Sequence, residues 1–321
     1  MKKFMPNIAL FAILACFWSG SFIGIKEAIT FWPPLFSAAI RVTVALLFLM
    51  TLMLITRKDF AIPFTLRWRI WIVGLFSQSL PFAFLFWGEH LISPGLAGIL
   101  NGTAPIWTLL LSFVLFPKSN PFSIAKTLGM ITGMTGIIII FLPLVTIDKH
   151  LATLWGACSV LAMAICYGIG AILNQHFLTG KDKIDFIKNI YHQHWASVVF
   201  LFSTSCLLEK WPNTQTLFTA TTPWLASIYL GVFSTGIAWM IYYHLIRQWD
   251  ALRASTVMYI VPVLALFWDF LFYGTVPLIT EIYGVILIIL GVVLTQSTYF
   301  KQLFSRDLPQ DTCTLPAQQT E

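Results

Sequence analysis

Residues 97–105 read AGILNGTAP, and residues 254–262 read ASTVMYIVP. Each stretch lies in a long apolar segment, and the prolines that end them, Pro105 and Pro262, fall about halfway along their segments. A proline inside a helix removes one backbone hydrogen bond and kinks the helix. Prolines are common in membrane helices, but two of them at matching places predict a duplicated chain with a functional site near the membrane midplane.

Glycines further along the chain repeat in the same way. Gly129 and Gly136 are seven residues apart in one apolar segment, and Gly284 and Gly291 have the same spacing in another. Small residues at such spacings allow membrane helices to approach closely. The prolines and glycines together predict two homologous halves.

The composition predicts that lipid surrounds these segments. Of 321 residues, 58% are hydrophobic and 10% are charged, whereas a soluble chain carries about 25% charged residues. A soluble fold could not cover so much apolar surface with polar groups. A membrane-spanning helix needs about 20 apolar residues. We therefore expect an all-α polytopic membrane protein with ten transmembrane helices, near residues 7–25, 34–56, 69–89, 95–116, 125–144, 151–174, 189–209, 223–244, 251–272 and 278–298.

Five helices in each half predict an inverted repeat. A unit of five spans begins and ends on opposite sides of the membrane, so a second copy that follows it lies upside down. The expected units are residues 7–145 and 151–298, and the polar residues 299–321 are expected to form a disordered cytoplasmic tail. Two inverted units around one site are typical of alternating-access transporters.

Lysine and arginine predict the orientation, because they accumulate on the cytoplasmic side. With the N-terminus inside, the cytoplasmic segments hold 15 of these residues and the outer segments hold three. Both termini are therefore expected in the cytoplasm. The net charge of +6 then reflects topology and anionic lipids rather than nucleic-acid binding. The first segment could also be a cleaved signal peptide, but its apolar pattern continues past Cys16 to Ile25.

Several short motifs carry a family resemblance. Residues 17–22 read FWSGSF, residues 33–34 are a proline pair, and residues 39–41 read AIR. With the matched prolines and glycines, the chain resembles the drug/metabolite transporter superfamily, specifically its EamA-type branch of ten-helix transporters, over about residues 7–298. The family often has a Gly-Glu pair after the fourth span of each half. Residues 116–118 (FPK) and 274–276 (GTV) lack it, so no role of that glutamate is transferred.

The resemblance implies a central cavity lined mainly by the first, third, fourth, sixth, eighth and ninth spans. Polar and aromatic residues at mid-depth on these spans are the candidates for substrate binding. Amides and hydroxyls can hold a polar ligand, and aromatic faces can hold apolar or cationic parts. Each of them could instead pack against a neighbouring helix or lie at the lipid interface. The candidates are Trp18, Ser19, Ser21, Gln78, Asn101, Thr103, Tyr167, Asn174, Trp239, Tyr242, Tyr243 and Tyr259.

Charged residues inside spans are costly and therefore informative. Arg41 lies about seven residues into the second span, and Glu27 and Glu89 lie at the outer ends of the first and third. We expect Arg41 to pair with one of these acids as an outer gate or a structural clamp. The alternative is that its side chain extends to the outer membrane interface.

The function class follows from these features. We expect a secondary transporter, an exporter, of small organic metabolites such as amino acids, amines or drug-like compounds, in a bacterial inner membrane and as a monomer or homodimer. The sequence holds no GxxxxGK[ST] motif for ATP, and no cofactor, metal site or nucleic-acid partner is expected. The alternatives are a membrane receptor or assembly protein and a membrane enzyme, although no clustered catalytic residues are evident.

Overall fold

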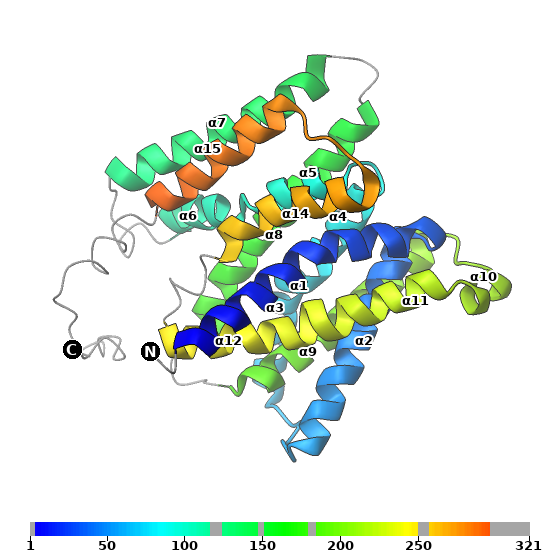
Figure 1. Ribbon diagram of the computed structural model, residues 1–321. Coiled ribbons are helices and arrows are strands. Elements are labelled where there is room, and N and C mark those ends of the chain that lie inside the picture. Colours follow the sequence, from blue (N-terminus) through cyan, green and yellow to red (C-terminus); the bar gives the residue numbers. More distant parts are fainter. Residues whose placement is uncertain (1–3, 116–123, 147–150, 179–183, 250–256, 296–321) are drawn as a thin grey trace, which may run out of the picture.

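The computed structural model describes residues 4–115, 124–146, 151–178, 184–249 and 257–295, and within these ranges the regular elements are all helices (Figure 1). The predicted tail lies outside them. The elements are α1 (Phe4–Phe31), α2 (Pro34–Ile55), α3 (Phe64–Gly74), η1 (Leu75–Ser79), α4 (Leu80–Glu89), α5 (Pro94–Asn101), α6 (Ala104–Leu115), α7 (Ile124–Thr146), α8 (Leu151–Leu178), α9 (Phe186–Leu208), α10 (Thr214–Thr219), α11 (Thr221–Ile228), η3 (Tyr229–Ile237), α12 (Ala238–Trp249), α14 (Val257–Tyr273) and α15 (Ile279–Thr295).

The chain is a multi-pass membrane protein. Seven helical stretches among the described residues are long and apolar enough to cross a bilayer, and two shorter apolar helices, Val257–Tyr273 and Ile279–Leu294, accompany them. Helices suit this setting because every backbone polar group in lipid must be bonded within the segment. The polar helix α9 has a sufficient length but does not belong to either group. A count of ten spans therefore stays a prediction.

Among the described residues, two helical stretches contain π-helical segments, which the sequence did not predict. The segment η1 continues α3 into α4, and η3 continues α11 into α12. In a π-helix each backbone bond spans five residues, which widens the turn, and such segments are frequent at functional sites. These two therefore direct attention to the helices around them.

The two prolines behave differently. The expected fourth span is broken after Asn101, and α6 begins at Ala104, directly before Pro105. Pro262 lies inside α14, which runs without a break. The two sites meet, because a Cβ atom added at Gly102 would lie 2.8 Å from Cγ of Pro262. The broken helix therefore packs on α14 through a glycine that leaves room for the proline ring.

Helices that are far apart in the sequence lie side by side. The helix α2 packs against α9, α4 against α8, and α1 against both α14 and the α11–α12 stretch. The helices α7 and α15 pair along their length at one side of the molecule (Figure 1). A Cβ atom at Gly136 would lie 2.8 Å from the carbonyl oxygen of Gly284, and one at Gly291 would lie 2.6 Å from that of Gly129. The predicted close packing at these glycines is confirmed.

Candidate functional site

Arg41 lies in the packed interior, on α2 where it faces η3 and α4. Its residue is only 5% exposed. The Nε and Nη2 atoms both donate to the hydroxyl oxygen of Thr235, at 3.3 Å, and Nη1 has no acceptor. The guanidinium carbon lies 4.2 Å from the ring centre of Phe82 and 5.9 Å from that of Phe86. A buried cation is thus held by one hydroxyl and two aromatic rings.

The π-helical segment η3 brings Thr235 to this place. Its hydroxyl donates to the carbonyl of Leu230, five residues earlier, at 2.8 Å. Gly231 lets α2 approach, because a Cβ atom there would lie 2.6 Å from Cγ1 of Val44. The Thr235 hydroxyl is therefore fixed as a donor to its own helix and presents its oxygen to Arg41.

Acidic groups surround this region but do not pair with Arg41. Glu89 is fully buried, and neither of its carboxylate oxygens has a hydrogen-bond partner. It is close enough for the charges of Arg41, Lys26 and Asp269 to act on it. Lys26 donates to the carbonyl of Glu89 at 2.8 Å, and Asp269 accepts from the backbone N–H of Gly95 at 2.9 Å. Both of these charged groups therefore bond backbone at helix ends.

The structure differs here from the expected ion pair. Glu27 accepts a hydrogen bond from the hydroxyl of Tyr273, at 2.6 Å. Among the described side chains, no salt bridge joins Arg41 to Glu27 or Glu89. The alternative, extension to the interface, is also not seen, because Arg41 is buried. The reason lies in the tertiary packing. Because α2 packs directly on η3, the hydroxyl of Thr235, rather than a carboxylate, lies within hydrogen-bond distance of the guanidinium.

The aromatic candidates gather in part. Trp18 on α1 lies with its ring centre 5.8 Å from that of Trp239 and 5.2 Å from that of Tyr242, both on α12. All three are partly exposed. The side chain of Tyr243 lies outside the described part of the chain. Tyr259 on α14 is partly exposed, and its hydroxyl oxygen is buried without a partner.

The predicted hydroxyl candidates are used within the fold. Ser21 and Thr103 each donate to the carbonyl three residues earlier, at 2.6 Å. Ser19 donates to the carbonyl of Cys16 at 3.3 Å and accepts from the indole nitrogen of Trp268 at 2.9 Å. All three candidates are buried. Their hydroxyl hydrogens therefore stabilise helices in this conformation rather than face an open site.

The amide candidates are less satisfied. The side-chain oxygens of Gln78 and Asn174 are buried without a hydrogen-bond partner. Asn101 at the end of α5 and Tyr167 on α8 are partly exposed, and Tyr167 is close enough to interact with the charge of Arg41. An unpaired buried polar group costs about 1–3 kcal/mol. Gln78, Asn174 and Tyr259 are therefore the predicted residues with unused capacity for a ligand.

The histidines of α9 bond to nearby backbone. His192 contacts the carbonyl of Phe60 and His194 contacts that of Ile190, each at 2.9 Å. The second ring nitrogen of His194 is buried without a partner. Within the described ranges, no three His, Cys, Asp or Glu residues come together.

Sequence reasoning missed three partners of Arg41, namely Thr235, Phe82 and Phe86. Phenylalanines are too frequent in this chain to signal a contact. Residues 231–236, which read GVFSTG, did hold a signal, because glycines that flank hydroxyl residues inside an apolar span allow close approach and altered hydrogen bonding.

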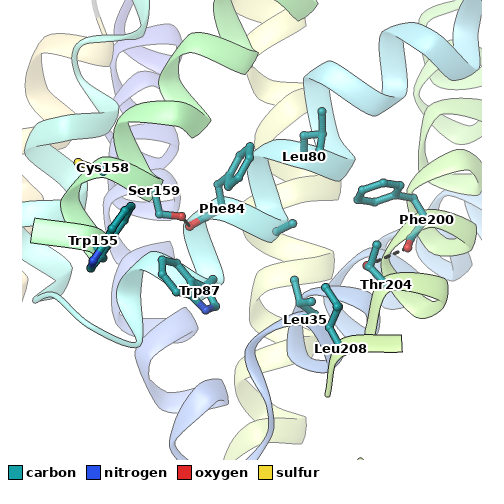
Figure 2. A pocket seen from close by; sticks show the side chains of 11 residues that line it. Leu35, Leu80, Phe84, Trp87, Trp155, Cys158, Ser159, Phe200, Thr204 and Leu208 are labelled. Carbon is teal, nitrogen blue, oxygen red and sulfur yellow. Dashed lines mark hydrogen bonds between the residues drawn. The ribbon is translucent and has the colours of Figure 1, made fainter. Parts of the chain in front are cut away.

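A separate groove of about 540 Å³ lies among α4, α8 and α9, as Figure 2 shows. Its two hydroxyls are already used, since Ser159 donates to the carbonyl of Phe84 at 2.8 Å and Thr204 to that of Phe200 at 2.9 Å. None of the predicted site residues lines it. The groove offers a ligand almost only apolar contacts. Its lining is Leu35, Leu80, Ala83, Phe84, Trp87, Trp155, Cys158, Ser159, Phe200, Thr204 and Leu208.

A charged clasp joins the α2–α3 link to the start of α9. Lys58 pairs with Asp185 at 2.6 Å, and Lys188 pairs with Asp59 at 3.2 Å. Partial burial alone would raise the pKa of Asp185, but hydrogen bonds from Lys58 and from the backbone N–H groups at the start of α9 outweigh it and lower the pKa. Hydrogen bonds from backbone N–H groups and from Lys188 also lower the pKa of Asp59. Both carboxylates are therefore ionised at neutral pH.

Comparison with known proteins places these features in context. The model of the EamA-like transporter family matches the chain twice, over residues 6–142 and 154–297. The uncharacterized transporter YoaV of Bacillus subtilis is 26% identical over 303 residues, which cover 94% of this chain and 99% of YoaV. The protein PagO of Salmonella typhimurium is 25% identical over 96% of both chains. YedA of Escherichia coli, an uncharacterized inner membrane transporter, is 25% identical over 82% of both.

The fold also occurs among solved structures. A crystal structure of another protein superposes with a TM-score of 0.62 at 17% sequence identity. The match covers 94% of this chain and 99% of the other. At this identity the likeness concerns the fold alone.

Proposed function

The chain belongs to the EamA-like transporter family, and from this premise we propose that it is a secondary transporter of small organic molecules that works by alternating access. The observation that carries the proposal is the buried bond between Arg41 on α2 and Thr235 on η3. It joins the two segments that the family model matches separately. A contact of this kind must break when two halves of a transporter move apart.

The proposed architecture is ten membrane helices in two inverted repeats, residues 7–145 and 151–298. The double match of the family model supports it. The packing supports it as well: the contact of α1 with α11, η3 and α12 has a counterpart in the contact of α8 with α3, η1 and α4. Each of these partner stretches contains one π-helical segment.

The proposed binding cavity lies where the helices of both halves meet. Its aromatic wall is Trp18, Trp239 and Tyr242, whose rings contact one another. Gln78 and Asn174 supply unused amide oxygens. The other predicted candidates keep this role as part of the proposal, and the bonds of the buried hydroxyls would have to rearrange as the cavity opens.

Arg41 is the proposed gate. In this conformation its bond to Thr235 holds the two matched segments together. Glu89 is the acid within range of its charge that lacks a hydrogen-bond partner on either oxygen. We propose that the two residues change partners during the transport cycle, because a buried guanidinium and a buried carboxyl group are both costly to leave without hydrogen-bond partners.

Cargo, direction and location complete the proposal. The cargo class is small metabolites such as amino acids, amines or drug-like compounds, and the direction is export. The bacterial inner membrane is supported by the relative YedA, and cytoplasmic termini are supported by the distribution of basic residues. The protein would work as a monomer or homodimer. A receptor or an enzyme without transport remains the competing function.

Flux measurements test the proposal. The purified protein is reconstituted in proteoliposomes, and uptake and release of a panel of labelled metabolites are measured for the wild type and for Arg41→Ala and Glu89→Gln. Transport of at least one compound is expected, and both variants should slow it. Transport at the wild-type rate in both variants would refute the proposed gating role of Arg41 and Glu89. Absence of flux for the whole panel, with correctly folded protein, would favour the competing function.

A further inference from the structure

We propose that Arg41 binds the carboxylate of the transported molecule, so that the cargo carries a free carboxyl group. The inference rests on the proposed transport function and adds the chemical class of the cargo. Its basis is the unsatisfied bonding capacity of a guanidinium that the fold buries almost completely.

The guanidinium of Arg41 has more hydrogen-bond donors than acceptors within reach. A guanidinium has five N–H donors and no acceptor. Those of Arg41 reach a single acceptor, the hydroxyl oxygen of Thr235, through two bonds of 3.3 Å. Nη1 has none. A charge buried with so few partners is costly by several kcal/mol, which indicates a place that another group fills during the working cycle.

One edge of the Arg41 guanidinium remains without a partner. The ring of Phe82 lies over the guanidinium, 4.2 Å from its central carbon. Thr235 occupies the edge formed by Nε and Nη2. The remaining edge, formed by Nη1 and the second hydrogen of Nη2, can donate two parallel bonds. A carboxylate has two oxygens at the spacing that this edge fits.

No acid among the described side chains bonds to the free edge of Arg41 in this conformation. Asp269 accepts a bond from the N–H of Gly95, and Glu209 accepts bonds from the N–H groups of Leu35 and Phe36, so each caps a helix. Glu27 accepts from a tyrosine hydroxyl. The carboxylate of Glu89 is near but makes no bond to the guanidinium. The free edge therefore has no carboxylate partner among the described side chains, and the proposed cargo carboxylate would bond it as the cavity opens.

The number of cations at this site favours a carboxylate over a phosphate as the ligand. A phosphate group carries close to two charges at neutral pH and calls for more than one cation. The ammonium of Lys26, which also acts on this region, is committed to the carbonyls of Glu89 and Ile92, at 2.8 and 3.2 Å. One guanidinium edge beside Phe82 and Phe86 suits a single negative charge on an apolar body.

Matched pairs of compounds provide the test. Thermal unfolding of the purified protein in detergent is followed with benzoate against benzamide, L-phenylalanine against L-phenylalaninamide, and phenyl phosphate, each at millimolar concentrations. In each pair, the carboxylate is the intended difference. At least one acid should raise the unfolding temperature of the wild type, and its amide should not.

Variants connect the effect to Arg41. We expect Arg41→Gln to weaken the apparent affinity for the acid roughly tenfold or more, the cost of lost bonds to a charged group. Arg41→Lys keeps the charge but loses the paired N–H donors. Its apparent affinity for the acid should lie between that of the wild type and that of Arg41→Gln. The exposed Arg67 provides the control, and Arg67→Gln should bind like the wild type.

The outcomes that overturn the proposal are distinct. Amides that stabilise as well as acids, a stronger effect of phenyl phosphate, or an unchanged acid effect in Arg41→Gln and Arg41→Lys would each remove the carboxylate site. So would the absence of any acid effect in folded wild-type protein. Flux of a compound that lacks a carboxyl group would leave the transport function intact and refute this inference.

Discussion

The two π-helical segments, η1 and η3, use the same bond for different partners. In η1 the hydroxyl of Ser79 donates to the carbonyl of Gly74, five residues earlier, and in η3 that of Thr235 donates to the carbonyl of Leu230. Both hydroxyls are buried. Each hydroxyl also contacts a helix from the other matched segment.

The packing around them is also alike. A Cβ atom at Gly74 would lie 2.9 Å from the carbonyl oxygen of Gln193 on α9, and one at Gly231 would lie 2.6 Å from Cγ1 of Val44 on α2. A glycine therefore lies at each close approach, Gly74 directly before η1 and Gly231 within η3. Shape alone does not distinguish the two regions.

The partner of the hydroxyl does distinguish them. Ser79 meets the neutral hydroxyl of Ser197, at 3.0 Å, whereas Thr235 meets the charged Arg41. The same hydroxyl-to-carbonyl bond thus occurs at both π-helical segments, but only the one in η3 contacts a buried charge. We infer that the η1 side serves as a structural joint and that the η3 side carries the gating contact.

The largest expected effect comes from Thr235→Val, which keeps the shape of the side chain but removes its oxygen. Arg41 would lose the acceptor of two hydrogen bonds while staying buried, and we expect a loss of about 2–4 kcal/mol in the free energy of unfolding. Reversible unfolding in mixed micelles with increasing denaturing detergent measures it. A cost no larger than that of Ser79→Ala would contradict the comparison.

The glycines test the part that the two regions share. Gly231→Ala and Gly74→Ala each place a methyl group against the neighbouring helix, and each should cost about 1–3 kcal/mol through overpacking. The same unfolding assay applies, with an alanine at the exposed Gly274, whose added Cβ would meet no atom within 4 Å but whose φ is +67°, as a variant strained only locally. A large cost at one glycine alone would show that the two contacts differ in shape.

The neutral joint should contribute less than the charged one. Ser79→Ala removes the bonds to Gly74 and Ser197, and we expect a loss of about 1 kcal/mol because both partners are uncharged. A double-mutant cycle with Ser197→Ala isolates the bond between the two hydroxyls. Transport at the wild-type rate in both single variants is expected, and a marked loss would give η1 a role beyond structure.

The smallest effect is expected at the charged clasp. Asp185→Asn keeps a cap for α9 but removes the ion pair with Lys58, and such exposed pairs contribute about 0.2–1 kcal/mol. Because the pKa of Asp185 is lowered in the folded protein, its contribution is present above the ordinary value of about 3.9 and is lost as the pH falls through the folded pKa. Unfolding curves of wild type and variant should therefore converge in acid and at high salt.

Much of the fold could be read from the sequence. The apolar segments predicted the helices. The expected second span, residues 34–56, agrees with α2 (Pro34–Ile55) to within one residue. The spacing of Gly129, Gly136, Gly284 and Gly291 predicted a close helix contact, which α7 and α15 make. These features are local or periodic, so composition and spacing carry them.

The site was less accessible. Arg41 stood out because a charge inside an apolar segment is rare, but its partner did not. Thr235 lies 194 residues away, and the glycines and hydroxyl residues around it indicate a close helix approach but not a charged partner. The aromatic group of Trp18, Trp239 and Tyr242 likewise joins helices whose contact only packing creates.

The sequence by itself determined that the chain is helical, apolar and repetitive, because hydrophobic length, proline and glycine act over a few residues. The tertiary structure alone decided that η1 and η3 are π-helical, that α2 packs on η3, and that a hydroxyl instead of an acid receives Arg41. The physical reason is that a buried charge bonds to whatever group the packing of neighbouring helices places within reach, and that packing depends on contacts between residues far apart in the chain.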